Sequence, residues 1–126
     1  MEMDNPHIRR RLGEAKSYAQ AAKTLLLSEA ERLMETMREY APQGRKLSRE
    51  EIFEVTLRQS RVVDLSVRAV DEVFKVAGTS ATVSGHALER VFRDVHMIAT
   101  HTVFRFDNAA ENWALAHFDL PATGRA

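Results

Sequence analysis

The chain has 126 residues, 44% of them hydrophobic, which is enough for one modest domain with a single core. Lysines and arginines (18) balance aspartates and glutamates (18), so no overall field draws the protein toward nucleic acid or an anionic membrane. Without cysteine, the chain has no disulfides, thiolate metal sites or cysteine nucleophiles. No apolar run approaches the roughly 20 residues of a membrane span, and the polar first residues lack the apolar core of a signal peptide. These features favour a soluble, cytoplasmic protein with neither nucleic-acid nor membrane partners.

Asn5 and Pro6 predict the start of a long first helix, because asparagine caps free N–H groups and proline at the first helical position sacrifices no hydrogen bond. Apolar residues then recur mostly in steps of three and four, the spacing of one helical face. They are Ile8, Leu12, Ala15, Ala19, Ala22, Leu26, Ala30, Leu33, Met37 and Tyr40. Such a helix is on the order of 50 Å long, much longer than so small a domain needs for itself. We expect it to pack against an equally long partner.

A second helix is expected after the turn at residues 41–44, where proline cannot continue the first helix and Gly44 readily takes a left-handed conformation. Ser48, with Glu51 three residues later, forms a capping box, and Gly78 ends the helix. Its apolar positions are Ile52, Val55, Val62, Val63, Leu65, Val70, Val73, Phe74 and Ala77. The valines favour a strand by propensity alone, but the length and the spacing predict a buried helix.

Residues 78–85 read Gly-Thr-Ser-Ala-Thr-Val-Ser-Gly, a loop compatible with backbone N–H groups close to a ligand. A short helix is expected over 87–94 and a last one from about 102 to 116. The predicted domain covers residues 1–118. The polar residues 119–126 form a tail that we expect to be disordered or extended.

A family resemblance rests on two segments around this loop. Residues 76–81 read Val-Ala-Gly-Thr-Ser-Ala, and residues 86–96 read His-Ala-Leu-Glu-Arg-Val-Phe-Arg-Asp-Val-His, with His101 shortly after. This pattern resembles the C-terminal domain of acyl-CoA dehydrogenase-like flavin-dependent monooxygenases, over nearly the whole chain. That group includes the oxygenase components of two-component systems acting on phenols, steroids and dibenzothiophene, which receive reduced flavin from a separate reductase.

The resemblance implies one catalytic residue, His101. True acyl-CoA dehydrogenases commonly carry a Tyr-Glu-Gly after the Arg-Asp pair, whose glutamate removes the α-proton of the substrate, and this triplet is absent here. In the monooxygenase branch, a histidine near that point faces the reactive edge of the flavin, where it acts as a base toward the substrate or hydrogen-bonds the flavin. An unperturbed pKa of roughly 6.5 suits histidine to such proton transfer. Without the resemblance, His101 at a helix start indicates a surface or capping residue.

The resemblance also implies that Thr79, Ser80 and Ser84 contact the flavin, FMN or FAD, because hydroxyls and backbone N–H groups suit phosphate. The alternative is that these hydroxyls cap the neighbouring helices. In the family, a helical domain, a β-domain and one further bundle helix precede this region. We therefore expect most of the flavin and substrate pocket to come from upstream sequence or a companion chain, with a flavin reductase as partner of the complete enzyme.

The spacing of the histidines does not favour a metal site. No two of His86, His96, His101 and His117 have the i, i+4 spacing of helical metal ligands. His96 does not share a helical face with His101, and we expect it at the surface. Two arginines and an aspartate within residues 90–94 are expected to form structural ion pairs rather than to take part in chemistry.

The predicted fold is all-α, an up-down helical bundle of the acyl-CoA dehydrogenase C-terminal domain type that lacks its first helix. An apolar groove would remain there, and exposing it is unfavourable by roughly 25 cal/mol per Å². We therefore expect a homo-oligomer, a dimer or tetramer, whose second copy fills the groove. Two functional hypotheses remain: part of a monooxygenase or hydroxylase using reduced flavin and oxygen, inactive in isolation, or a stand-alone helical oligomerisation or interaction module without catalytic activity.

Overall fold

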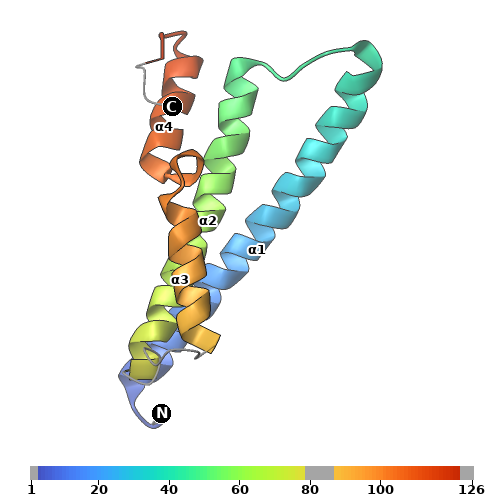
Figure 1. Cartoon of the computed structure of the whole chain (residues 1–126). Coiled ribbons are helices and arrows are strands. Elements are labelled where there is room, and N and C mark those ends of the chain that lie inside the picture. The colour runs from blue at the N-terminus through green and yellow to red at the C-terminus, as the bar shows by residue number, and fades with distance from the viewer. Residues whose placement is uncertain (1–2, 79–86, 123–126) are drawn as a thin grey trace.

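The computed structural model describes residues 3–78 and 87–122, and each regular element within these ranges is helical (Figure 1). In chain order they are the α-helices and 3-10 turns α1 (Pro6–Tyr40), η1 (Ala41–Gln43), α2 (Arg49–Ala77), α3 (Ala87–Thr100), η3 (Thr102–Phe104) and α4 (Phe106–His117). None of these helices is both long and apolar enough to cross a membrane. The predicted all-α fold is confirmed.

The ends of the two long helices form as predicted. The side chain of Asn5 accepts a hydrogen bond of 2.9 Å from the backbone N–H two residues later. Gly44 takes the left-handed conformation after η1, with φ 62°. Both hydrogen bonds of the capping box between Ser48 and Glu51 are present, and α2 ends before Gly78, whose φ is 66°.

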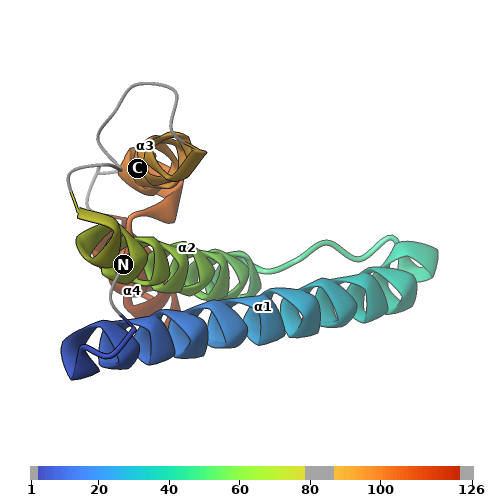
Figure 2. The same cartoon turned by 90° about the horizontal axis from the view of Figure 1, so that it is seen from below.

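The second long helix, α2, is the centre of the molecule. It contacts α1 along one side, α3 along its C-terminal half and α4 along its N-terminal half (Figures 1 and 2). The first helix runs antiparallel to α2, and the two ribbons separate toward the η1 connection (Figure 1). Within the described ranges, α1 has no contact with α3 or α4.

Polar side chains join α1 to α2 where the helices separate. Glu29 is 4% exposed and its carboxylate accepts two hydrogen bonds from the Arg58 guanidinium, while the Tyr40 hydroxyl donates to Glu51 at 2.6 Å. Hydrogen bonding to Tyr40 lowers the pKa of Glu51, and the same bond raises the pKa of Tyr40. These contacts join α1 to α2 where the two helices diverge.

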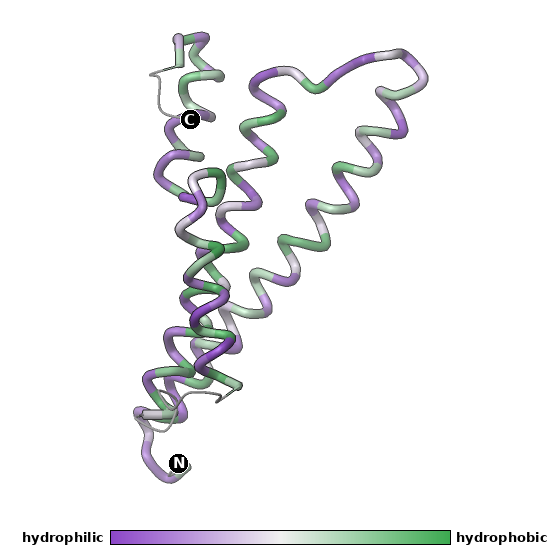
Figure 3. Tube along the Cα trace, viewed as in Figure 1, coloured by the Kyte–Doolittle hydropathy of each residue, from purple (hydrophilic) through white to green (hydrophobic). Residues whose placement is uncertain are grey.

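The core is small for a chain of this size. Among the described residues, the buried ones are Ala15, Ala22, Glu29, Tyr40, Ser60 and Ala109. The accessible surface is 8803 Å², whereas a compact monomer of this mass exposes about 6800 Å². Apolar residues lie at intervals along the whole of α1, including the end that diverges from α2 (Figure 3). An apolar groove between α1 and α2, lined mainly by alanines and valines, is among the exposed surfaces, as expected.

Two boundaries in the C-terminal third differ from the sequence prediction. The helix expected over 87–94 continues to Thr100, because residues beyond Asp94 also pack on α2. The last helix was expected from about residue 102, but the chain forms η3 and then turns at Arg105, whose extended backbone (ψ 116°) separates η3 from α4. The first tail residues fold back: the Arg49 guanidinium donates to the carbonyl of Leu120 at 2.9 Å.

Candidate active site

His101 lies at the corner between α3 and η3, where the chain leaves one helix and turns toward the next. Its backbone is extended, with φ −64° and ψ 131°, and its N–H still donates to the carbonyl of Ile98 at 3.1 Å. The imidazole lies 5.9 Å from the Phe104 ring, centroid to centroid, and the residue is exposed. The corner therefore presents an accessible imidazole beside an aromatic wall.

A backbone contact selects the tautomer of His101. Its Nδ1 accepts a hydrogen bond of 3.3 Å from the N–H of Val103, so the proton of the neutral ring is on Nε2. Within the part of the chain that the structure describes, Nε2 has no hydrogen-bond partner. The neutral side chain is thus a hydrogen-bond donor toward whatever occupies the space beyond the corner.

Ser60 of α2 anchors the corner from beneath. It is fully buried, and its hydroxyl donates to the carbonyl of Val103 at 3.2 Å. Val103 therefore presents its N–H to His101 and its carbonyl to Ser60. A buried hydroxyl paired in this way orients the η3 backbone, and with it the ring of His101.

The third helix is held on α2 by a ring stack and a polar pair. Phe92 stacks on Phe74 with centroids 4.2 Å apart, and His96 packs against Phe92 at 4.3 Å. The Nε2 atom of His96 is 2.8 Å from a carboxylate oxygen of Asp71. His96 was expected as a surface residue, but it is half-buried and joins α3 to α2, because α3 turns its Phe92 side toward that helix.

The fourth helix is held on α2 in a similar way. The Nδ1 atom of His117 is 2.8 Å from a carboxylate oxygen of Glu50, and its ring stacks on Trp113 at 4.9 Å. Near the start of α4, the Arg61 guanidinium lies 3.8 Å from the centre of the Phe106 ring. Both helices that meet at His101 are therefore fixed to the same rigid element.

A shallow pocket of about 270 Å³ opens between the corner and α2. Its walls are apolar and partly aromatic, and its rim is ionic. The lining residues are Val63, Asp64, Val67, Ala99, Phe104, Arg105, Phe106 and Asp107. On the rim, Asp64 pairs with two arginines of α2 and Arg105 pairs with Asp107. The volume of this pocket is below the roughly 300–1,000 Å³ of complete small-molecule sites. Such a volume is expected of a pocket that forms one side of a larger site.

The other predicted site residues, Thr79, Ser80 and Ser84, lie outside the described residues. Their segment begins after the end of α2 and ends before Ala87, whereas His101 follows the far end of α3. Fourteen helical residues separate the two regions, a distance of about 20 Å.

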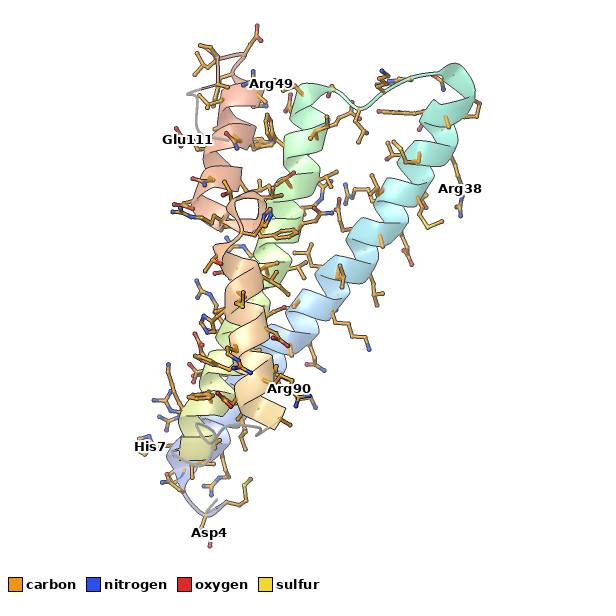
Figure 4. All side chains as sticks on the ribbon, in the orientation of Figure 1. Asp4, His7, Arg38, Arg49, Arg90 and Glu111 are labelled. Carbon is orange, nitrogen blue, oxygen red and sulfur yellow. The ribbon has the colours of Figure 1, made fainter. Side chains whose placement is uncertain are left out.

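The ion pairs expected within residues 90–94 are absent among the described residues. The charged side chains of this segment are exposed instead. Arg90 lies at the start of α3 (Figure 4).

No group of three potential metal ligands occurs among the described residues. Sequence reasoning did not anticipate the pairs of His96 with Asp71 and of His117 with Glu50. Each pair joins residues far apart in the sequence, 25 and 67 positions respectively, so no local spacing indicates it. One sequence feature does indicate that His96 faces α2: it lies four residues after Phe92, on the apolar side of α3.

The chain is similar to several known proteins. Residues 2–106 match the family model described as acyl-CoA dehydrogenase, C-terminal domain. A pigment production hydroxylase from Rhodococcus sp. (strain ATCC 21145) is 29% identical over 114 residues, which are 90% of this chain and 28% of that protein. The chain thus spans less than a third of this relative's length.

Two solved structures share the fold. The 3-HSA hydroxylase from Rhodococcus sp. RHA1 superposes with a TM-score of 0.74 at 24% identity, covering 97% of this chain and 31% of that one. For the HsaA monooxygenase from M. tuberculosis the TM-score is 0.71 at 23% identity, covering 94% and 30%. With the family match over most of its length, this chain belongs to the acyl-CoA dehydrogenase C-terminal domain family.

Proposed function

We propose that this chain is the C-terminal helical part of a flavin-dependent monooxygenase or hydroxylase, and that His101 acts at the reactive edge of the flavin. The observation that carries the proposal is the corner itself: an exposed imidazole, oriented through Val103 and the buried Ser60, beside a pocket with aromatic walls. The relatives named above, hydroxylases and a monooxygenase, support this class of reaction.

Reduced flavin, when bound, supplies the electrons that activate oxygen. The contribution of His101 follows from its tautomer. A base needs a lone pair on Nε2 and therefore carries its proton on Nδ1. There the proton would point at the N–H of Val103, and the observed hydrogen bond would be lost. A hydrogen-bond donor needs Nε2–H, which the observed contact favours. We therefore assign His101 the donor role toward substrate or flavin, in preference to the base role.

The described residues fit part of a flavin site. They offer one oriented donor and an apolar wall, whereas phosphate contacts are proposed for Thr79, Ser80 and Ser84 at the other end of α3. A flavin nucleotide, FMN or FAD, is extended between its reactive edge and its phosphate, so the two ends of its site can lie on different segments of the chain. The rest of the site is proposed to come from upstream sequence or a companion chain.

The complete enzyme is proposed to be a cytoplasmic homo-oligomer, a dimer or tetramer, that receives reduced flavin from a flavin reductase. The large accessible surface supports association, since 8803 Å² exceeds the area of a compact monomer of this mass by about 2000 Å². The same observation favours the second candidate function, a stand-alone helical oligomerisation or interaction module without catalytic activity.

The test replaces His101 by alanine in the complete enzyme, whether the chain is joined to upstream domains or mixed with a companion chain. Loss of one oriented donor is expected to lower kcat for hydroxylation by about 10²–10³. The Kd for flavin is expected to stay within about twofold, because the proposed phosphate contacts lie elsewhere. Stopped-flow turnover and flavin titration measure the two quantities.

The matched control is His7→Ala, which removes an exposed imidazole from the first turn of α1, near the N-terminus (Figure 4). Its turnover should equal that of the unsubstituted enzyme. Unchanged hydroxylation by His101→Ala would remove the catalytic assignment. Micromolar binding of FMN or FAD by the 126-residue chain alone, with or without dithionite, would show that the flavin site needs no further sequence.

A further inference from the structure

Met97 is the most exposed large apolar side chain among the described residues, at 70%. It lies in the last turn of α3, four residues before His101. The inner face of the same helix is formed by Phe92 and His96, whose rings pack against each other and against Phe74 and Asp71 of α2. Met97 is therefore left accessible at the end of the helix that leads to the candidate catalytic residue.

The backbone places Met97 and His101 on the same side of the corner. The Thr100 hydroxyl donates to the carbonyl of Met97 at 2.7 Å, so the last turn of α3 stays closed. The φ of His101, −64°, is that of a helical residue, and only its ψ of 131° turns the chain away. The Cβ of His101 thus continues the helical path, on which residues four apart have Cβ atoms about 5–6 Å from each other.

The thioether of Met97 is also a reactive group. Methionine is readily oxidised to its sulfoxide, and no cysteine competes for an oxidant in this chain. Met3 and Met34 are comparably exposed, at 52% and 56%. They lie before and within α1, a helix that has no contact with α3 in the described part of the chain. Position beside the corner, more than exposure, distinguishes Met97 from these two residues.

We propose that Met97 is an oxidation site that regulates the corner. Hydrogen peroxide released there converts its thioether into a sulfoxide, and the sulfoxide oxygen accepts the Nε2–H of His101. The donor of the candidate site is then occupied and the enzyme is switched off. This inference rests on the proposed function for the source of the peroxide.

The oxidation balances with the reactants of the proposed reaction. Oxygen that accepts two electrons from reduced flavin, and two protons, without hydroxylating a substrate leaves as hydrogen peroxide. A lone pair of the Met97 sulfur attacks one peroxide oxygen, so an S–O bond forms and the O–O bond breaks. The second oxygen leaves as water. Sulfur is oxidised by two electrons, and peroxide is reduced by two.

The sulfoxide has a partner within reach because the Nε2 atom of His101 has no hydrogen-bond partner among the described residues. The contact of Nδ1 with the N–H of Val103 keeps the proton on Nε2. A thioether is a weak acceptor, whereas oxidation makes the side chain polar. The three rotatable bonds of methionine let the new oxygen reach the ring. Methionine sulfoxide reductases reverse the oxidation, so the switch is reversible.

The contact can be tested on the 126-residue chain without flavin. The chain is oxidised with hydrogen peroxide, and the imidazole of His101 is followed by ¹⁵N-edited NMR at a pH where its spectrum shows the neutral ring. The Nε2 proton should exchange with water about two- to tenfold more slowly after oxidation, the range that one net hydrogen bond corresponds to. Treatment with methionine sulfoxide reductase should restore the original rate.

Met97→Leu is the matched control, because leucine keeps an apolar side chain and removes the sulfur. The variant still carries the other methionines of α1 and the N-terminus, which the same peroxide treatment oxidises. The exchange rate of its His101 proton should be the same before and after oxidation.

The source of the peroxide is tested in the complete enzyme during turnover. Catalase in the solution destroys peroxide that leaves the site, and peptide mass spectrometry gives the ratio of sulfoxide at Met97 to sulfoxide at Met3. The reference is the same enzyme without flavin, treated with added peroxide. The ratio should be about tenfold higher under turnover, because an oxidant formed beside its target acts at high effective concentration.

Activity should follow the modification. Over successive turnovers the unsubstituted enzyme should lose at least about tenfold of its initial rate, toward the level of His101→Ala, since its one oriented donor becomes occupied. Methionine sulfoxide reductase should restore the rate. Met97→Leu should keep its own initial rate under the same conditions.

Three results would overturn the proposal. The first is an unchanged exchange rate of the His101 proton in the oxidised chain, and the second is an equal change in oxidised Met97→Leu. The third is the same sulfoxide ratio under turnover as with added peroxide. A complete enzyme that neither hydroxylates nor consumes reduced flavin would overturn the proposed function, and with it the source of the peroxide. The spectra of the chain alone would still decide whether Met97 sulfoxide binds His101.

Discussion

Tyr40 and Glu51 tie the end of α1 to the start of α2 through one hydrogen bond of 2.6 Å. The same carboxylate accepts the backbone N–H of Ser48 at 3.1 Å, so a single side chain closes the capping box and holds the preceding helix. Hydrogen bonds from Tyr40 and Ser48 lower the pKa of Glu51 from its usual 4.5. The contact to Glu51 raises the pKa of Tyr40 above its usual 10.0.

These opposite shifts define a pH window for Tyr40→Phe. A lowered carboxyl pKa contributes stability that is full above 4.5 and is lost as the pH falls through the folded-state pKa of Glu51. A raised phenol pKa contributes stability that is full below 10.0 and is lost above it. The difference in melting temperature between the unsubstituted chain and Tyr40→Phe should therefore be constant from about pH 5 to 9 and shrink below pH 4.

Tyr18→Phe is the control for this series, since it removes the other tyrosine hydroxyl of the chain, which interacts with Arg68 rather than with a carboxylate. Its effect on the melting temperature should not shrink in acid in the same way. A Tyr40→Phe difference that is as large at pH 3 as at pH 7 would show that the hydrogen bond to ionised Glu51 contributes nothing.

At the scale of the helices, two glycines with opposite roles make a matched pair. Gly13 lies within α1 and is exposed, and an added Cβ would meet no atom within 4 Å. Gly13→Ala should therefore stabilise the chain by about 0.5–1 kcal/mol, because alanine loses less backbone entropy in a helix. Gly44 has equally open surroundings but a φ of 62°, so Gly44→Ala should destabilise the chain by about 1 kcal/mol. Urea unfolding measures both, and effects of the same sign would contradict the argument.

The long helices could be predicted because their signals are local. Asn5, Ser48, Gly44 and Gly78 each act within a few residues, and the structure places all four at helix ends. The end of α3 could not be predicted in this way. It depends on contacts with α2, such as that of His96 with Asp71, which is 25 residues away in the sequence.

The same distinction applies to the candidate site. His101 was proposed as a site residue through the family resemblance, but its tautomer depends on how η3 packs on Ser60, 43 residues from Val103. No spacing in the sequence indicates that hydrogen bond. The orientation of the imidazole is a property of the packed corner, and it is what distinguishes the donor role from the base role.

At the scale of the whole molecule, helices are arranged on both sides of α2, but none of the described helices covers the outer face of α1 (Figure 2). If that face is closed by a second copy, folding and association are coupled, and the melting temperature must depend on concentration. Raising the concentration 40-fold, from 5 to 200 µM, raises the free energy of unfolding per dimer by about 2.2 kcal/mol.

An unfolding entropy of about 2.1 cal/mol/K per residue, over the two chains, converts this free energy into a rise of about 4 °C in melting temperature. Differential scanning calorimetry at the two concentrations measures the rise. A variant carrying Leu27→Glu and Met34→Glu, which places charge at two exposed apolar positions of α1, should melt at the same temperature at both concentrations, and below the unsubstituted chain. Equal melting temperatures for the unsubstituted chain at 5 and 200 µM would mean that α1 is stable with its apolar face in water, and that folding does not require a second copy.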